Sequence, residues 1–174
     1  IIDKLTNNIR GLIWISGSTG NPDEEYLDLK KCETNIRINF LNPVLLINKI
    51  APKMIIGKKS FIAVLTSVAG LRGRSKRLFY SSAKSALINY LSGLRQKLNK
   101  EKINVITVIP GYMKTKPFNI KAQSFLITSP EKSARIIYDA IKKNKEIVYI
   151  NFFWKIITFC INLIPEKIYK KLKF

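Results

Sequence analysis

Four short apolar runs constrain what this chain can fold into more than any other feature. Helical segments of more than ten residues separate them, and each run is too short to be an ordinary helix. Strands that are apolar throughout are typical of a parallel sheet with helices on both faces, because such strands bury both of their sides. The pattern predicts an α/β fold with a doubly wound parallel sheet. The expected strands are residues 11–16, 60–66, 103–109 and 146–150.

Three helices are expected between these strands. Pro43 should bend or restart the first, because a proline ring is incompatible with an uninterrupted helix. Ser129 and Pro130 mark the start of the third, since serine caps a helix and proline suits its first turn. We expect a loop of polar and aromatic residues before Ser129. The expected helices are residues 24–49, 79–100 and 129–143, and residues 1–8 have the pattern of a helix end.

The composition excludes several classes of protein. With 174 residues and 47% hydrophobic side chains, the chain can bury the core of one domain, or of most of a larger one. It has no His, and its two Cys, Cys32 and Cys160, are far apart. A His-based triad, a His-ligated zinc site and a disulfide framework are therefore excluded, and we expect no metal site.

The chain is strongly basic, with 31 Lys or Arg, 11 Asp or Glu and a formal charge of +20. Such a charge favours an anionic partner, which could be nucleic acid, a phosphorylated small molecule or an anionic membrane. The alternative is a composition bias spread over a solvated surface. No recognised nucleic-acid motif is present, and the aromatic residues cluster in an apolar helix, so we expect no specific nucleic-acid partner.

Tyr80 and Lys84 stand four residues apart at the start of the second helix. This spacing places both side chains on one helical face, where the ammonium can lower the pKa of the phenol. A tyrosine made more acidic can protonate a carbonyl oxygen or deprotonate an alcohol. The pair alone is a weak motif, because a Tyr and a Lys on one face more often serve packing and solvation.

Other polar residues follow the predicted strands. Ser67 ends the second strand, Asn39 lies in the first long helix, and the stretch from Pro110 to Thr115 follows the third strand. In a doubly wound sheet, ligands bind at the carboxyl ends of the strands, where these loops gather.

Because these residues occur in a particular order along the chain, the sequence resembles the short-chain dehydrogenase/reductase family. The resemblance implies a Rossmann-type fold, NAD or NADP as cofactor without a readable preference, and hydride transfer to a ketone or from a secondary alcohol. It also implies a homo-oligomer paired through the long helices that contain Asn39 and Tyr80. It is carried by the order Asn39, Ser67, Tyr80, Lys84, by Thr66-Ser-Val-Ala-Gly70, and by Pro110-Gly111 with Thr115.

The resemblance also implies a role for each residue. Tyr80 would be the general acid/base, and Lys84 would lower its pKa and bind the nicotinamide ribose. Ser67 would orient and polarise the substrate carbonyl, while Asn39 would hold a water that relays protons to Lys84. The residues implied to contact the cofactor are Tyr80, Lys84, Pro110, Gly111, Thr115 and Gly17.

The sequence departs from the family at its beginning. The Gly-rich TGxxxGxG turn that binds the cofactor pyrophosphate does not precede Gly11, and only Gly17 survives from the usual Asn-Asn-Ala-Gly strand end. A family domain has about 250 residues. We therefore expect residues 1–150 to be a partial NAD(P)-binding domain that lacks its first βαβ unit. A fragment with half of the cofactor site should be inactive in isolation.

Within the family, the sequence is most similar to membrane-associated decaprenylphosphoryl 2-keto-pentose reductases. This resemblance rests on the basic loop between Ser67 and Tyr80 and on the aromatic-rich ending with a basic tail. Arginine side chains suit phosphate oxygens, so Arg72 and Arg74 are candidates for binding a lipid- or phosphate-linked substrate. The alternative is a solvated loop.

Residues 151–174 form the expected amphipathic and basic C-terminal extension. Asn151, Lys155, Thr158 and Asn162 recur as one polar stripe on an apolar helix that is shorter than the ~20 residues needed to span a bilayer. We expect a cytoplasmic protein, with a helix that either lies on the inner face of the membrane, packs on the core or forms a homodimer interface. The alternative to an enzyme is a non-catalytic binding protein of the same fold on an anionic membrane.

Overall fold

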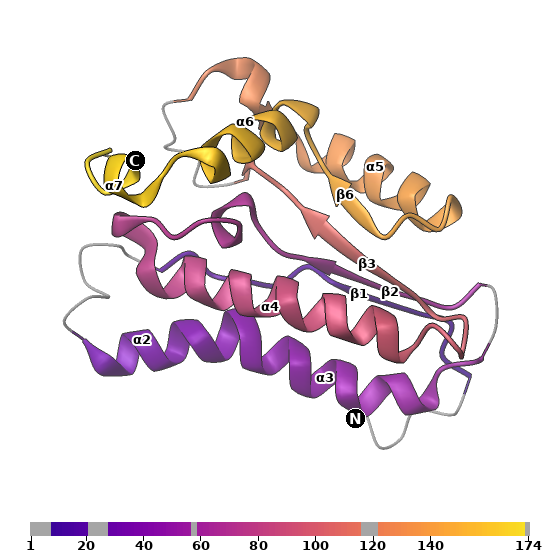
Figure 1. Ribbon diagram of the computed structural model, residues 1–174. Helices are drawn as coiled ribbons and strands as arrows, with labels where there is room; N and C mark the ends of the chain where they lie inside the picture. The colour runs from indigo at the N-terminus through magenta and orange to yellow at the C-terminus, as the bar shows by residue number, and fades with distance from the viewer. Residues whose placement is uncertain (1–7, 21–27, 57–58, 116–121, 173–174) are drawn as a thin grey trace.

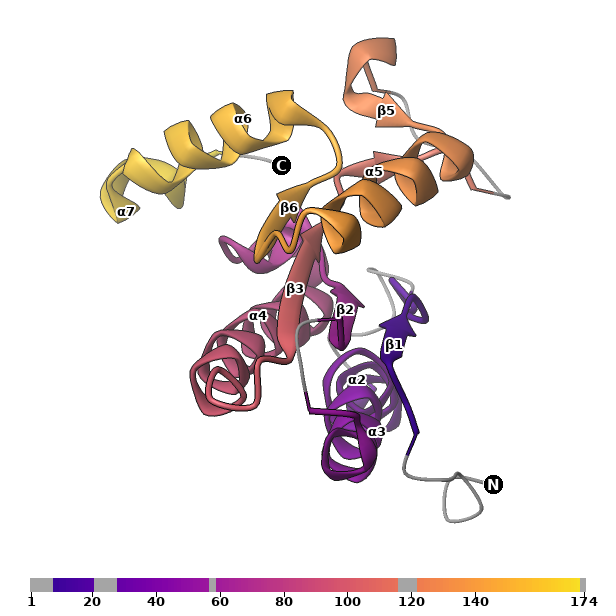
Figure 2. The ribbon, with the colours of Figure 1, turned by 90° about the vertical axis from the view of Figure 1, so that its right-hand side faces the viewer.

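A four-stranded parallel sheet forms the centre of the computed structural model, which describes residues 8–20, 28–56, 59–115 and 122–172. The strand order is β1-β2-β3-β6, and the register places Trp14, Val64 and Thr107 side by side across three strands. Helices cover both faces (Figures 1 and 2), which confirms the expected α/β fold with a Rossmann-type sheet. The strands are β1 (Gly11–Trp14), β2 (Phe61–Leu65), β3 (Asn104–Ile109) and β6 (Ile147–Tyr149).

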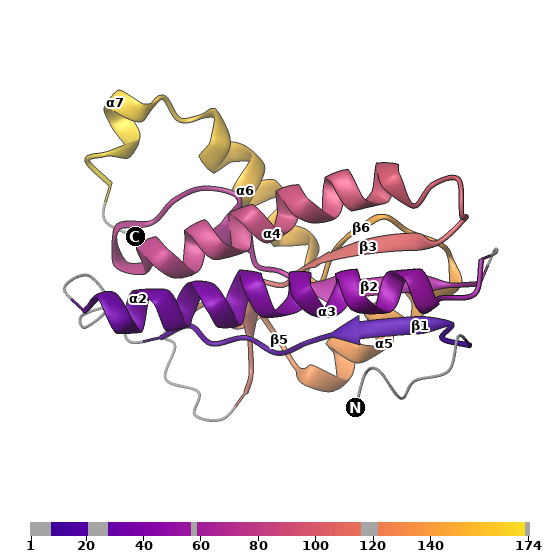
Figure 3. The ribbon, with the colours of Figure 1, turned by 90° about the horizontal axis from the view of Figure 1, so that it is seen from below.

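The helices divide the core into two layers. On one face, α2 and α3 run beside α4 (Figure 3), and residues such as Ile47, Leu87 and Val105 are fully buried between them and the sheet. On the other face, α5 packs over β2 and β3 through Ile137 and Ala140. The helices are α2 (Leu29–Ile36), α3 (Asn42–Ile50), α4 (Leu78–Lys97) and α5 (Pro130–Lys142), and Ser129 caps α5 as expected.

Pro43 acts through a short π-helical segment. Between α2 and α3, η2 (Arg37–Leu41) has π geometry, and the Asn42 N–H donates to the Arg37 carbonyl five residues before it. Pro43 has no N–H to offer the Asn39 carbonyl, so the regular α-helical ladder is interrupted here. The expected bend or restart therefore takes the form of a widened turn that contains Asn39.

Strand β1 differs from the expected buried strand. It pairs only with β2 in the part of the chain that the structure describes, and its residues alternate between exposed and half-buried. Ile13 is 50% exposed and Ile15, just after the strand, is 69% exposed. The prediction of full burial was wrong here because β1 lies at an edge of the sheet, whereas β2 and β3 are central and buried.

The stretch between β3 and α5 is more regular than the expected loop. Tyr112–Met113 (β4) and Ile127–Thr128 (β5) form a small parallel pair, with Tyr112 opposite Ile127. Two-residue strands carry too little periodicity to be recognised in a sequence. Together with η6 (Ser124–Leu126), they bring the segment before α5 against the end of β3.

The chain ends in α6 (Phe152–Leu163) and α7 (Glu166–Tyr169), which lie near the carboxyl ends of the strands (Figure 1). Trp154 anchors α6 in a small cluster with Val68 and Ile109. Thr158, expected in the polar stripe, is buried and donates to the Trp154 carbonyl at 2.7 Å. No helix among the described residues is long and apolar enough to cross a membrane. The helix end expected in residues 1–8 lies almost wholly outside the described residues.

Candidate active site

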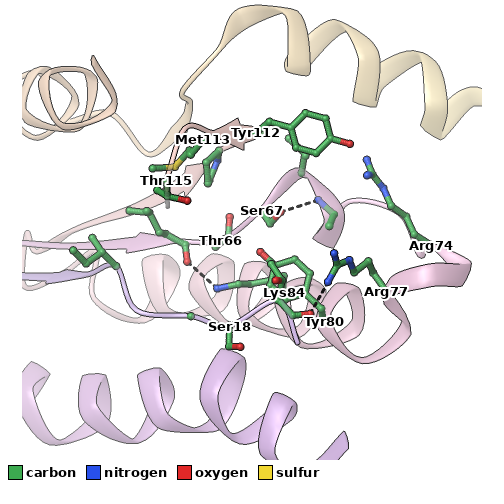
Figure 4. A pocket seen from close by; sticks show the side chains of 18 of the residues that line it. Ser18, Thr66, Ser67, Arg74, Arg77, Tyr80, Lys84, Tyr112, Met113 and Thr115 are labelled. Carbon is green, nitrogen blue, oxygen red and sulfur yellow. Dashed lines mark hydrogen bonds between the residues drawn. The ribbon is translucent and has the colours of Figure 1, made fainter. Parts of the chain in front are cut away.

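A pocket of about 490 Å³ opens at the carboxyl ends of β1, β2 and β3 (Figure 4). Its floor is formed by Tyr80 and Lys84 of α4, and its opposite wall by the segment after β3. Of the site residues predicted from the sequence, all except Asn39 and Arg72 line it. The predicted residues in the pocket are Gly17, Ser67, Arg74, Tyr80, Lys84, Pro110, Gly111 and Thr115.

Ser67 is fixed at the end of β2 by the short helix that follows it, η4 (Val68–Gly70). Its Oγ accepts a hydrogen bond from the Ala69 N–H at 3.1 Å, which leaves the hydroxyl proton available to another acceptor. A Cβ on Gly70 would lie 2.7 Å from the backbone carbon of Lys84, so glycine is needed for η4 to lie this close to α4. The Ser-x-Ala-Gly stretch thus holds Ser67 against the turn that carries Tyr80 and Lys84.

Tyr80 is half-buried and lines the same pocket as Ser67. Burial raises the pKa of Tyr80 above its ordinary value, while the Ser67 side chain and the charges of Arg77 and Arg74 act in the opposite direction. The Lys84 Nζ lies 5.8 Å from the centre of the Tyr80 ring. In this state burial has the largest effect and the charges that lower the pKa of Tyr80 are those of Arg77 and Arg74. That Lys84 lowers this pKa stays a prediction.

Lys84 is the most deeply buried cation of the pocket, with 3% of its surface exposed. Its Nζ donates to the Leu65 carbonyl at 3.3 Å, and burial lowers the pKa of Lys84 to about 8. A Cβ on Gly17 would lie 3.2 Å from this Nζ and 3.0 Å from the Asn39 Oδ1. Gly17 therefore lets the chain after β1 pass closely over Lys84.

Asn39 is fully buried behind the pocket rather than in its lining. Its amide group donates to the Ser18 carbonyl at 2.7 Å and to Asn35, and its Oδ1 accepts from the Ser18 N–H at 3.2 Å. Asn39 thus clamps the backbone that follows Gly17. The structure brings Asn39, Gly17 and Lys84 together, although only the latter two reach the cavity.

Gly111 has a structural requirement that its sequence motif did not reveal. A Cβ at this position would overlap the indole ring of Trp154. The Trp154 Nε1 donates to the Leu126 carbonyl at 2.9 Å, and its ring meets the Tyr112 ring edge-on at 5.1 Å. The first turn of α6 therefore packs directly behind the stretch from Pro110 to Thr115, which the sequence predicts to contact the nicotinamide.

The two candidate arginines point to different places. Arg74 lines the pocket and, with Arg77, lies on one side of it in Figure 4. Arg72 instead reaches the C-terminal helices, where it donates to the Ile161 carbonyl and pairs with Glu166 at 3.0 Å. Sequence position alone could not distinguish the two, because the distinction depends on where α6 and α7 lie.

Arg77, another residue of the basic loop between Ser67 and Tyr80, also lines the pocket. It is the N-cap residue of α4, and its Nη1 donates to the carbonyls of Thr19 and Gly20 at 2.9 and 3.2 Å. Arg77 thus joins the chain after β1 to the start of α4, the helix that carries Tyr80 and Lys84. Lys76 also lines the pocket, and no acidic residue does so within the part of the chain that the structure describes.

A second pocket of about 690 Å³ shares Arg74 and Tyr112 with the first. The shared residues place the two cavities next to each other. The described part of its lining is largely apolar and contains no acidic residue. The remaining lining residues are Ala122, Gln123, Ser124, Leu126, Trp154, Ile157 and Ile161.

Comparison with known proteins identifies the family. The family model for short chain dehydrogenases matches residues 1–124, so the protein belongs to the short-chain dehydrogenase/reductase family. The chain is 22% identical over 156 residues to an uncharacterised oxidoreductase of Mycobacterium tuberculosis, covering 90% of this chain and 63% of that protein. It thus spans less than two thirds of that relative's length.

Solved structures of low sequence identity share the fold. A short chain dehydrogenase from Burkholderia cenocepacia in complex with NADP matches with a TM-score of 0.78 and 16% identity, over 94% of this chain and 68% of that chain. A 3-oxoacyl-[acyl-carrier protein] reductase from Brucella melitensis in complex with NAD matches with a TM-score of 0.74 and 18% identity, over 86% and 68%. The sheet whose strand ends line the pocket therefore has the same fold as the sheets of these two structures.

Proposed function

We propose that this protein is an NAD(P)-dependent oxidoreductase that reduces a ketone or oxidises a secondary alcohol. The observation that carries the proposal is the convergence of Ser67, Tyr80 and Lys84 in one pocket at the carboxyl ends of the strands. The titles of two solved structures with this fold name NADP and NAD as their ligands, which supports a nicotinamide cofactor. The Brucella protein is a reductase of 3-oxoacyl groups, which supports a carbonyl substrate.

The residues of the pocket fit the nicotinamide end of such a cofactor. The Lys84 ammonium has three donors, and the Leu65 carbonyl is its one acceptor among the described residues, so hydroxyls can still bind there. Gly17 leaves the space over Lys84 that a side chain would fill. Gly17, Lys84 and the segment from Pro110 to Thr115 would hold the nicotinamide and its ribose. When bound, the nicotinamide supplies or accepts the hydride.

Tyr80 moves the proton of the proposed reaction. In reduction, its phenol gives a proton to the carbonyl oxygen of the substrate, and in oxidation the phenolate takes the proton of the alcohol. Ser67 donates a hydrogen bond to the same substrate oxygen and orients it. Lys84 carries a positive charge next to the site, which favours the phenolate form of Tyr80 once the pocket is filled and water is excluded. Asn39 acts as a positioning residue, since it holds the backbone next to Gly17.

The test compares Tyr80→Phe with Tyr90→Phe in the complete gene product. Tyr90 lies on the same helix, but its hydroxyl donates to Asn48 Oδ1 away from the pocket, so it is a matched control. We expect Tyr80→Phe to lower kcat with a ketone substrate by at least about a hundredfold, the usual contribution of a general acid. Nicotinamide binding, measured by fluorescence titration, should change little. Substantial turnover by Tyr80→Phe would refute the role, and cofactor binding without turnover in the wild type would favour a non-catalytic protein.

We further propose that the substrate is anionic and carries an apolar part, as a lipid- or phosphate-linked substrate does. Arg74 lines both pockets, and among the described residues neither has an acidic residue in its lining. The second pocket is walled by Trp154, Ile157 and Ile161. An anionic group would bind Arg74 while an apolar chain lies in the second pocket. Arg74→Gln should raise KM for an anionic ketone at least about tenfold and leave KM for a neutral ketone nearly unchanged. Arg135→Gln, on the exposed side of α5, is the control.

A further inference from the structure

Helix α6 leaves a large apolar face uncovered. Its five side chains are about half to two-thirds exposed, although all of them are aromatic or long aliphatic residues. Exposed apolar patches of this kind mark surfaces that meet a partner or a membrane. The exposed fractions are 66% for Phe152, 49% for Phe153, 47% for Ile156, 64% for Phe159 and 66% for Leu163.

The spacing of these residues aligns them on one side of the helix. Phe152, Ile156, Phe159 and Leu163 follow at intervals of four, three and four residues, which is the periodicity of a single helical face. Trp154 and Thr158 are buried and lie on the opposite side. Helix α6 therefore packs on the protein with one apolar face and presents a second one to its surroundings.

The orientation of α6 and α7 is fixed by the basic loop before α4. The Arg72 guanidinium donates to the Ile161 carbonyl, pairs with Glu166 and stacks 3.8 Å over the Tyr169 ring. The Tyr169 hydroxyl donates to the Gly73 carbonyl at 2.6 Å. These contacts join both ends of α7 to one loop, so the apolar face of α6 cannot simply rotate inward.

Positive charge surrounds this face. Within residues 151–172, the exposed lysines are Lys155, Lys167, Lys170 and Lys171. The one acidic residue there, Glu166, is paired with Arg72. The segment therefore combines an apolar face with cations that have no acidic neighbour in the segment to neutralise them.

We propose that α6 and α7 dock the protein on the surface of an anionic lipid bilayer. An apolar face rich in Phe, flanked by lysines, is the composition of helices that lie in the membrane interface, and twelve residues are too few to span it. A second copy is the less favoured occupant, since pairing this face would bring together the same lysines on two molecules of charge +20. Anionic headgroups complement that charge, each lysine near the surface contributing about 1 kcal/mol.

Vesicle sedimentation tests this proposal with the whole chain and without cofactor or substrate, so its outcome is independent of the proposed reaction. We expect the protein to pellet with phosphatidylcholine vesicles that contain phosphatidylglycerol, much less with phosphatidylcholine alone, and less in high salt. Ile156→Ser with Phe159→Ser should weaken binding at least about tenfold, because each apolar side chain contributes more than 1 kcal/mol when buried. Leu29→Ser removes another exposed apolar side chain, 84% exposed on α2, and should leave binding unchanged.

A comparison of two triple variants tests whether the lysines of α7 contribute to vesicle binding. Lys167→Gln, Lys170→Gln and Lys171→Gln together should weaken binding to the anionic vesicles, whereas Lys142→Gln, Lys143→Gln and Lys145→Gln at the end of α5 should have little effect. Equal binding by both sets would overturn the proposal. So would a dimer in light scattering that Phe159→Ser converts to a monomer without any vesicle binding, because the occupant would then be a second copy.

A fluorophore attached to Cys160 reports directly whether α6 contacts the membrane. Cys160 is exposed on α6, while Cys32, the other cysteine of the chain, is buried. An environment-sensitive fluorophore on Cys160 should shift its emission to the blue on adding anionic vesicles. Cys160→Ser should abolish labelling, and an unshifted emission under conditions of full sedimentation would contradict docking through α6.

Discussion

Burial of the Lys84 side chain disfavours its charged form. The side chain is almost fully enclosed, and its one hydrogen bond among the described residues is to the Leu65 carbonyl. A buried ammonium is tolerated in a folded protein only when neighbours compensate for its lost hydration, and here that compensation is small. A residue that the proposed chemistry uses is therefore one whose charge destabilises the folded state.

We predict that Lys84→Met stabilises the protein at neutral pH. The pKa of Lys84 is about 8 when folded, below the value of 10.5 for an ordinary lysine, so the unfolded chain binds more protons between these pH values. Wild-type stability should rise with pH across this window through this group. At pH 7 the variant should exceed the wild type by up to about 3 kcal/mol, and the difference should shrink as pH approaches 10.5.

Urea unfolding at several pH values measures this difference. Lys97→Met, at the exposed end of the same helix, is the control and should show no comparable gain at pH 7. A Lys84→Met variant that is less stable than the wild type at pH 7 would contradict the prediction.

Gly111→Ala should destabilise the protein through α6. The added Cβ would overlap the Trp154 indole, which is 5% exposed and has little room to move. Overpacking of this kind costs about 1–3 kcal/mol, measurable by urea unfolding. Gly93→Ala, in α4 with nothing near its Cβ position, should instead raise stability by about 1 kcal/mol. Equal effects of the two substitutions would show that the Trp154 contact is not responsible.

At the scale of elements, Arg72 determines how firmly the C-terminal helices are held. Arg72→Met should free α6 and α7 from the basic loop, because the Ile161 and Glu166 hydrogen bonds and the stacking on Tyr169 are lost together. Hydrogen exchange in residues 161–172 should accelerate at least about tenfold, with the sheet unchanged. Arg74→Met, two residues away without such contacts, serves as the control. Unchanged exchange in the Arg72 variant would mean that other contacts hold the helices.

The elements themselves were largely predictable from the sequence. Short apolar runs indicated the four strands, and helical periodicity with signals such as Ser129-Pro130 indicated the three helices between them, because local pattern determines these elements. The small β4-β5 pair and the exposure of β1 were missed, since pairing partners are set by the whole fold. The shared pocket of Ser67, Tyr80 and Lys84 followed from strand-end topology, whereas the direction of Arg72 and the Gly111–Trp154 contact depend on a helix from the far end of the chain.

At the scale of the whole molecule, charge acts on stability as well as on partners. The formal charge of +20 repels itself in the compact state, and salt screens this repulsion over about 10 Å at 0.1 M. We predict that the thermal midpoint rises by a few degrees between low and moderate NaCl, corresponding to about 1 kcal/mol. Differential scanning fluorimetry measures it, with sucrose of equal osmolality as the control. A midpoint that falls with NaCl would indicate that attractive ion pairs outweigh the repulsion.

The exposed edge of β1 bears on how the protein behaves when concentrated. Within the described residues, β1 has a neighbouring strand on one side alone, and such an edge beside apolar residues, here Ile13 and Ile15, is a template for edge-to-edge aggregation. β1 is only four residues long, and the molecule carries a formal charge of +20. Electrostatic repulsion between two copies therefore opposes pairing of their β1 edges. Polyanions such as heparin, which neutralise that charge, should therefore promote precipitation at concentrations where the protein alone stays dispersed.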